Sequence, residues 1–200
     1  MKEIKIKNQE SKIPGPLIVV SGPSGSGKTT VIARLLAIGD LPLHHSVSAT
    51  TRRPRPGERD GVDYHFLTRE QFDAEMAGGA LLEWAEVHGQ RYGTLRREVE
   101  PYRGRGIGVI LDIDVQGAAA IRRQCPDTVL VFLRASSMEA YERRLRQRGT
   151  EDERALERRL AAAQQELACA HHYDYQVIND DLDTAVRDLH ALIKHQFGDR

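Results

Sequence analysis

A glycine-rich run near the N-terminus has the residue types needed to bind a polyphosphate. It reads Gly22-Pro23-Ser24-Gly25-Ser26-Gly27-Lys28-Thr29 and fits the pattern G-x-x-x-x-G-K-[ST]. Glycines let backbone amides turn toward a phosphate, the lysine can bridge β- and γ-phosphates, and the next hydroxyl can hold Mg²⁺. We therefore predict a triphosphate-binding loop made of Gly22, Pro23, Ser24, Gly25, Ser26, Gly27, Lys28, Thr29 and Thr30.

Two arginines in a proline-rich loop indicate a second anion site. Arg52 and Arg55 lie in the stretch Arg52-Arg53-Pro54-Arg55-Pro56-Gly57. Two guanidinium forks can bind a dianionic phosphate bidentately, and the hydroxyls of Tyr64 and Tyr92 can add neutral donors. These four side chains are predicted to bind the phosphate of a nucleoside monophosphate. The alternative is an ordinary solvated basic loop.

The elements expected around these residues form an α/β fold. Short β-rich runs at 17–21, 108–112, 129–133 and 175–178, with another near 45–48, alternate with helical stretches. The helices are expected at about 28–38, 117–124, 137–148, 151–171 and 181–196. This alternation is typical of a parallel sheet with helices on both faces. Together with the glycine-rich motif it predicts a P-loop NTPase-type sheet. Ser136, Thr68 and Asp181 are predicted to cap helices, since each can bond first-turn amides.

Asp112 ends one of these apolar strands, at the sheet edge where ligands bind in open α/β folds. We predict that Thr29 and Asp112 hold Mg²⁺, and that Asp112 contacts the ion either directly or through a water molecule. A carboxylate that caps the next helix is the alternative for Asp112.

Two segments interrupt this alternation. From residue 50 to 93 the chain has a basic loop, a strand at 62–67, a short helix and a strand at 81–87, which predicts a small insert of antiparallel strands. Between Tyr141 and Arg159, several arginines flank Gly149-Thr150, which can act as a hinge. Arg144 and Arg148 are one helical turn apart and point the same way. The other arginines there are expected to form a solvated face.

The composition limits the possible functions. The chain has 200 residues, 40% of them hydrophobic, and 29 basic against 29 acidic residues. This suits one compact domain and gives no overall field toward nucleic acid or a membrane surface. Apolar runs are far shorter than the roughly 20 residues that span a bilayer, and no secretory signal is recognised. With only Cys125 and Cys169 present, a cytoplasmic location is expected.

Several further stretches, together with the glycine-rich loop, resemble the guanylate kinase family over about residues 17–197. They are the stretch 46–58, Asp63-Tyr64-His65-Phe66, Tyr92-Gly93-Thr94 and the stretch 111–117, in this order. The resemblance implies Mg²⁺-assisted in-line transfer of a phosphoryl group from ATP to GMP, and also to dGMP. It implies that Lys28 and the lid arginines Arg144, Arg148 and Arg159 are catalytic. The small-molecule partners are then ATP and GMP, while an oligomeric state cannot be predicted.

The resemblance also implies a guanine pocket. Guanine presents its N1–H and N2–H₂ donors side by side, which a carboxylate can accept, and its O6 needs a donor. Glu83 then takes this edge, Ser48 contacts the base, and Asp114 and Thr94 assist. With the phosphate ligands, the implied GMP-binding set is Ser48, Arg52, Arg55, Tyr64, Glu83, Tyr92, Thr94 and Asp114.

The implied domain layout has a core, an insert and a lid. The core spans 17–49, 94–140 and 161–200, the mostly β GMP-binding insert spans 50–93, and the helical lid region spans 141–160. Residues 1–16 are expected to be a flexible extension, because Pro14-Gly15-Pro16 marks a boundary.

Three other functions compete with this one. Asp114-Val115-Gln116-Gly117 fits the D-x-x-G of GTPase switches, but no N-K-x-D follows in the sequence. A non-catalytic module, like the guanylate-kinase-like domains of scaffold proteins, would not need the intact Gly27-Lys28-Thr29. Another P-loop kinase with a different phosphorylated acceptor remains the nearest rival.

Overall fold

The core of the molecule is a five-stranded parallel sheet. The computed structural model describes residues 13–87, 89–147 and 153–198. The strand order is β2-β7-β1-β8-β9, and every neighbouring pair is parallel. The strands are β1 (Leu17–Ser21), β2 (Leu43–His45), β7 (Gly108–Asp112), β8 (Val129–Arg134) and β9 (Tyr175–Ile178). Their carboxyl ends therefore share one edge, where open α/β sheets bind ligands.

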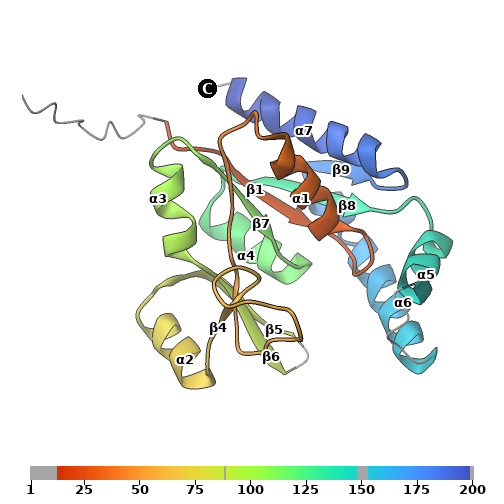
Figure 1. The fold of residues 1–200 in the computed structure, drawn as a ribbon, viewed down its shortest axis with the longest axis horizontal. Helices are drawn as coiled ribbons and strands as arrows, with labels where there is room; N and C mark the ends of the chain where they lie inside the picture. The colour runs from red at the N-terminus through yellow and green to blue at the C-terminus, as the bar shows by residue number, and fades with distance from the viewer. Residues whose placement is uncertain (1–12, 88, 148–152, 199–200) are drawn as a thin grey trace, which may run out of the picture.

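Helices cover both faces of this sheet, as predicted (Figure 1). On one face lie α1 (Lys28–Ile38) and α7 (Leu182–Gly198), and on the other lies α4 (Val115–Gln124). Side chains of β1 alternate between the two faces: Ile18 and Val20 pack with α1 and α7, while Leu17 and Val19 pack with α4. All of them are fully buried, which stabilises the fold by about 1.5–3 kcal/mol per side chain. The central strand thus gives a rigid support to the loop that follows it.

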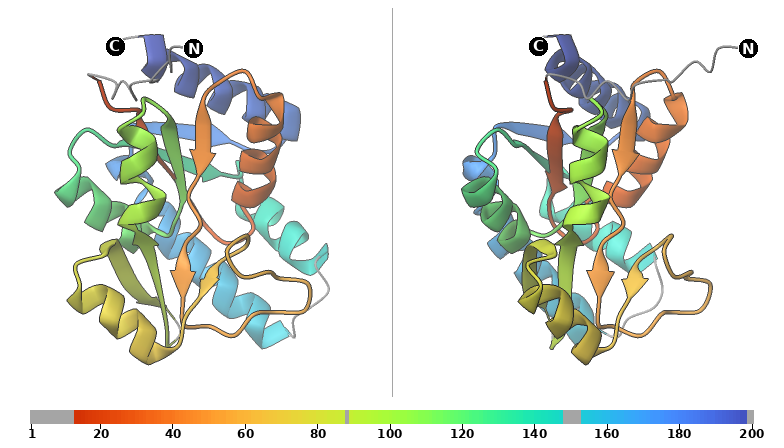
Figure 2. Two further views of the ribbon diagram at one scale, coloured as in Figure 1. Left: turned by 60° about the vertical axis from the view of Figure 1, so that its left-hand side comes forward. Right: turned by 90° about the vertical axis from the view of Figure 1, so that its left-hand side faces the viewer.

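A second, smaller sheet lies beyond the carboxyl edge of the core sheet (Figure 2). Its order is β4-β3-β6-β5, with β3 (Ala49–Thr50), β4 (His65–Phe66), β5 (Leu81–Val87) and β6 (Gln90–Leu95). Phe72 of α2 (Arg69–Ala77) is fully buried against it. The predicted antiparallel insert is a mixed sheet instead, because β3 and β4 pair in parallel while the other pairs are antiparallel. The segments η1 (Arg96–Glu98) and α3 (Glu100–Arg103) return the chain to the core.

Two helices follow β8 and pack against each other at one side of the glycine-rich loop. They are α5 (Met138–Gln147) and α6 (Glu153–Leu167), and η2 (Ala170–His172) connects α6 to β9. Tyr141 of α5 is fully buried, and its hydroxyl accepts a hydrogen bond from the Ala135 amide at 2.9 Å. Among the described residues, no helix is long and apolar enough to cross a membrane.

Some predicted boundaries are wrong, and turns explain them. The strand predicted near 45–48 ends at His45, because Ser46 donates its amide to Ile110 O and the chain then leaves for the second sheet. The strand predicted at 62–67 is only His65–Phe66, since the amides of residues 62 and 63 both bond Arg59 O in a turn. Helix α6 ends at Leu167, and 170–172 form the separate η2.

Two of the three predicted helix caps are confirmed. Thr68 and Gln71 form a capping box, and Asp181 accepts the Thr184 amide at 2.9 Å. The prediction for Ser136 is wrong, because α5 begins one residue later and Ser137 accepts the Ala140 amide at 3.4 Å. The amide of Ser136 instead donates to Asp180.

The described end of the predicted N-terminal extension is packed onto the core. Gly15 and Pro16 are buried, the Gly15 amide donates to Arg103 O, and Pro16 O accepts the Val109 amide. Ordered structure therefore begins before the predicted boundary at Leu17, while residues 1–12 lie outside the described residues.

Candidate active site

The glycine-rich loop joins β1 to α1 and presents backbone amides to the carboxyl edge of the sheet. Gly22 has a φ of 144°, and a Cβ there would lie 2.0 Å from Leu133 O, so only glycine fits. The first turn of α1, described in full, has no acidic residue and no side-chain cap. Unbonded amides and the helix dipole together favour an anion at this point. The loop therefore has the local geometry that a polyphosphate site requires.

The loop is held from the side by residues distant in sequence. Lys28 Nζ donates to Gly22 O at 2.7 Å, and buried Asn179 Nδ2 donates to Ser26 O at 2.7 Å. Arg144 donates to Ser26 O at 3.4 Å and also to Asn179 O. Sequence reasoning missed Asn179, although it follows a strand directly, the same signal that identified Asp112.

Thr29 and Asp112 meet beside Lys28 and form a candidate magnesium site. The Thr29 hydroxyl donates to Asp112 Oδ2 at 3.4 Å. Mg²⁺ takes hard oxygen ligands and is usually held by only one or two protein groups together with phosphates and water. The described residues contain no cluster of three or more His, Cys, Asp or Glu side chains suited to a metal. The alternative role for Asp112 is wrong, since Asp114 caps α4 and accepts the Gly117 amide at 2.8 Å.

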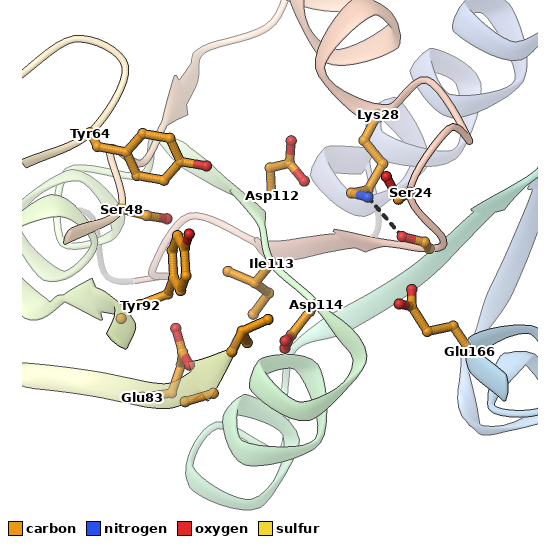
Figure 3. Close-up of a pocket in the computed structure, with 14 residues that line it drawn as sticks. Ser24, Lys28, Ser48, Tyr64, Glu83, Tyr92, Asp112, Ile113, Asp114 and Glu166 are labelled. Carbon is orange, nitrogen blue, oxygen red and sulfur yellow. Dashed lines mark hydrogen bonds between the residues drawn. The ribbon is translucent and has the colours of Figure 1, made fainter. Parts of the chain in front are cut away.

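A single cavity of about 280 Å³ connects the glycine-rich loop with the second sheet. Figure 3 shows Ser24 and Lys28 at one end, Asp112 and Asp114 in the middle, and Glu83 at the other end. The remaining polar lining residues with predicted roles are Ser48, Tyr64 and Tyr92. Residues from the core and from the insert thus line one continuous space.

Glu83 is a buried carboxylate at the far end of this cavity. It lies on β5 opposite Thr94, whose hydroxyl donates to Glu83 Oε1 at 2.7 Å. A β-bulge between Leu81 and Glu83 shifts the register, so that Glu83 points inward while Trp84 is exposed. Burial raises the pKa of Glu83 to about 7, and nearby Asp114 adds to the rise. The carboxylate is therefore poised to take up hydrogen-bond donors from a ligand.

Tyr64, Tyr92 and Ser48 surround the space between Glu83 and the glycine-rich loop. The two tyrosine rings meet edge to face, with centroids 6.1 Å apart. Burial raises the pKa of Tyr64, so its hydroxyl stays protonated and can donate a hydrogen bond. The Ser48 hydroxyl also points into the cavity (Figure 3).

Comparison with known proteins places these features in a family. The sequence profile of guanylate kinase matches residues 15–196. The chain belongs to the guanylate kinase family. A curated guanylate kinase from Rubrobacter xylanophilus is 50% identical over 90% of this chain and 94% of its own length. One from Symbiobacterium thermophilum is 50% identical over 92% of this chain and 86% of its own length.

A solved structure supports the same family membership. The crystal structure of guanylate kinase from Anaplasma phagocytophilum is similar, with a TM-score of 0.77 and 32% sequence identity. The match covers 92% of this chain and 87% of that chain. The guanylate kinase fold thus extends over the core sheet and over the small mixed sheet.

In this member of the guanylate kinase family, Arg52 carries an ion pair that the sequence did not predict. Arg52 Nη1 and Nη2 each lie 2.9 Å from an oxygen of Glu58, and the Arg55 amide donates to Glu58 Oε2 at 2.7 Å. These contacts lower the pKa of Glu58 to about 2, the Arg52 bond being the largest cause. The guanidinium also lies 5.2 Å from the centroid of the Tyr64 ring, which lines the cavity.

The Glu58 pair leaves Arg52 able to bind an anion. The bonds to Glu58 and to Arg53 O use three of the five N–H donors of Arg52, and a side-chain hydrogen bond also links Arg52 to Tyr92. The edge formed by Nε and Nη2 keeps N–H donors that bond neither Glu58 nor Arg53 O. Neither Arg52 nor Arg55 is among the described residues that line the cavity, and the Arg55 side chain is exposed. Their predicted phosphate contacts remain a prediction.

Removing the Glu58 charge should weaken binding of the phosphate acceptor. In Glu58→Gln the bidentate partner of Arg52 is lost, and a charge-assisted hydrogen bond of this kind is worth about 1.5–3 kcal/mol. Part of this free energy holds the Arg52 guanidinium in position. The KM for the acceptor should therefore rise about tenfold, with a smaller change in kcat. Steady-state kinetics at saturating donor nucleotide measures this. Glu86→Gln is the control, because Glu86 is exposed on β5, and an equal KM in both variants would contradict the positioning role.

The predicted lid arginines are only partly placed by the structure. Arg144 lies on α5 and bonds the carbonyls at the base of the loop, as described above. Arg159 is partly buried on α6, and Arg148 lies outside the described residues. Glu166, also on α6, lines the cavity near Lys28, and burial raises its pKa. Sequence reasoning missed Glu166, because a glutamate in a charged helix is not distinguishable from a surface residue.

Proposed function

We propose that this protein transfers the terminal phosphoryl group of ATP to GMP, and also to dGMP, giving ADP and the nucleoside diphosphate. The observation that carries the proposal is the single cavity whose lining includes Gly22 and Lys28 at one end and Ser48 and Glu83 at the other. A donor polyphosphate and an acceptor nucleotide can occupy the two ends and meet in the middle. Membership of the guanylate kinase family supports the same activity.

The donor end acts by positioning and by charge. Backbone amides within residues 22–30, Pro23 excepted because it has no N–H, and Nζ of Lys28 would bind the β- and γ-phosphates. For this, Lys28 must exchange its bond to Gly22 O. Thr29 and Asp112 would hold Mg²⁺, which neutralises charge on the β- and γ-oxygens when bound. Arg144, with Arg148 and Arg159 in the predicted lid, would add positive charge around the transferred group.

The acceptor end needs no general base. The nucleophile is a phosphate oxygen that is already ionised near neutral pH, because the second pKa of a phosphate monoester is about 6. Arg52 and Arg55 would hold this phosphate together with the hydroxyls of Tyr64 and Tyr92. Aligning the two phosphates in this way supplies the orientation on which phosphoryl transfer depends.

Specificity would come from the hydrogen-bonding edge of the base. The carboxylate of Glu83 accepts from donors, which guanine presents at N1 and N2, whereas adenine presents the lone pair of its N1. Thr94 holds Glu83 Oε1, and Ser48, which lines the same cavity, would contact the base. A buried carboxylate left without donors is costly, so AMP should be a poor acceptor.

Closure of the insert, 50–93, and of the lid region, 141–160, belongs to the same proposal. Excluding water would prevent hydrolysis of ATP in the absence of transfer. A cytoplasmic location is also part of it, since Cys125 and Cys169 are both unpaired, as expected in a reducing compartment.

A panel of acceptors tests the proposal. Purified protein with ATP and Mg²⁺ is assayed by coupled detection of ADP against GMP, dGMP, AMP, CMP, UMP and a sugar phosphate. We expect GMP and dGMP to exceed the other acceptors by at least about a hundredfold in kcat/KM. Comparable turnover of AMP would contradict the guanine pocket, and a preference for the sugar phosphate would favour a different P-loop kinase.

A further inference from the structure

The first turn of α4 lies directly against the carboxylate of Glu83. A Cβ placed on Gly117 would lie 3.0 Å from Glu83 Oε2, 3.3 Å from Ile113 Cδ1 and 3.4 Å from Asp114 Oδ1. Contacts of 3.0–3.4 Å are tighter than ordinary side-chain packing, so the neighbouring atoms would have to move by a few tenths of an ångström. Gly117 therefore leaves space beside the Glu83 carboxylate that the Cβ of any other residue would occupy.

The glycine is not explained by the backbone. Gly117 has the ordinary helical conformation of α4 and is not among the described glycines with positive φ. The residues that follow are Ala118, Ala119 and Ala120, the best helix formers, whereas glycine is among the worst. A residue that opposes its local secondary structure points to a requirement elsewhere, and here the requirement is room for Glu83.

Glu83 has little freedom to avoid an added methyl group. Its Oε1 is held by the Thr94 hydroxyl at 2.7 Å, and its backbone pairs with Thr94 next to a β-bulge. Within the described residues, no side chain donates to Oε2, so we take Oε2 as the oxygen that would face a ligand. The atom that a Cβ at Gly117 would displace is thus the atom that would face the base.

We propose that Gly117 is a positioning residue that sets base specificity, by leaving the space in which the Glu83 carboxylate reaches the N1–H and N2–H₂ edge of guanine. This inference rests on the proposed function and adds a specificity-determining position to it. Gly117 touches no reacting atom. Its effect passes through Glu83, and it should alter the acceptor nucleotide and not the donor.

Gly117→Ala tests this with a split between the two substrates. We expect KM for GMP to rise about tenfold, with kcat within threefold and KM for ATP within twofold of the unchanged protein. The better helix propensity of alanine opposes the cost of the close contact, so the melting temperature should stay within a few degrees of that of the unchanged protein. Gln116→Ala is the matched control, since Gln116 is exposed on the same helical turn and the change also improves helix propensity; it should leave both KM values unchanged.

A second variant series tests whether the effect passes through Glu83. Aspartate at position 83 is one methylene shorter and makes room for the new methyl group, so Gly117→Ala should raise KM for GMP less than twofold in a Glu83→Asp background. A wild-type KM for GMP in Gly117→Ala would overturn the proposal, as would an equal rise in KM for ATP. If the unchanged protein does not phosphorylate GMP, the proposed function itself fails. That outcome is distinguishable from both results for Gly117→Ala.

Discussion

Replacement of Lys28 by methionine is expected to lower kcat by about three orders of magnitude, because a preorganised charge at the transferred phosphoryl group is removed. Within the described residues, the Lys28 ammonium donates a hydrogen bond to Gly22 O alone, so its loss should cost the fold little. Single-turnover and steady-state measurements of ADP and GDP formation at saturating ATP and GMP would give the effect on chemistry. A thermal melt within a few degrees of the unchanged protein would show that the fold is intact.

The chain offers a matched control for this variant. Lys194 is exposed on α7, away from the cavity, and Lys194→Met removes the same charge and shape. It should retain full activity. If Lys28→Met kept more than a tenth of the original kcat, the role given to the glycine-rich loop would be wrong.

Glu83→Gln should lower kcat/KM for GMP by about two to three orders of magnitude, since an amide N–H₂ would face the donors of the base. The KM for ATP should change little, because Glu83 lies at the other end of the cavity. Glu86→Gln, on the same strand and exposed, is the control. Normal use of GMP by Glu83→Gln would remove the basis for guanine recognition.

The pH dependence of GMP use should report the same carboxylate. Burial raises the pKa of Glu83 to about 7, and only the ionised form accepts both donors of the base. The KM for GMP should therefore fall about tenfold as pH rises from about 6 to about 8. The phosphate of GMP titrates in the same range, so the profile is compared with that of Glu83→Gln, which shares the substrate and should lack this component.

As pH rises, ionisation of Glu83 should improve GMP binding but lower the stability of the folded protein. The pKa of Glu83 rises from 4.5 to about 7 on folding, so the folded protein binds more protons than the unfolded chain within that window. Stability from this group is therefore lost as pH rises through the window. Glu83→Gln should melt several degrees above the unchanged protein at pH 8 and close to it at pH 4.5. A lower melting temperature at pH 8 would contradict the cost assigned to the buried charge.

The sequence predicts the contiguous parts of the site best. Residues 22–29 form a loop and the start of α1, so their spacing alone specifies a phosphate cradle. The strand ends at Ser21 and Asp112 follow from apolar runs. The family resemblance then supplied Glu83, Ser48 and Thr94. Glu83 and Ser48 line one cavity, and Thr94 donates a hydrogen bond to Glu83. Composition and periodicity could not have assigned them, because each is an ordinary residue of a short strand or loop.

What the sequence did not predict are contacts between distant or irregular segments. Glu58 reaches Arg52 because residues 52–58 form a tight loop, and no periodic pattern encodes that geometry. Asn179 meets Ser26 only when β9 and β1 lie in the same sheet. Gly117 was read as part of a GTPase-like motif and of the 111–117 stretch that resembles the family, but it was given no role, since its role depends on how closely α4 approaches β5.

The central claim is that one cavity holds a triphosphate cradle and a base-reading carboxylate in line. A bisubstrate ligand in which adenosine and guanosine are joined by five phosphates tests it directly by calorimetry. It should bind at least about a hundredfold more tightly than ATP or GMP alone, because the second end binds at high effective concentration. The analogue with adenosine at both ends should bind far more weakly. Equal binding of both analogues, or no gain over ATP, would contradict the account.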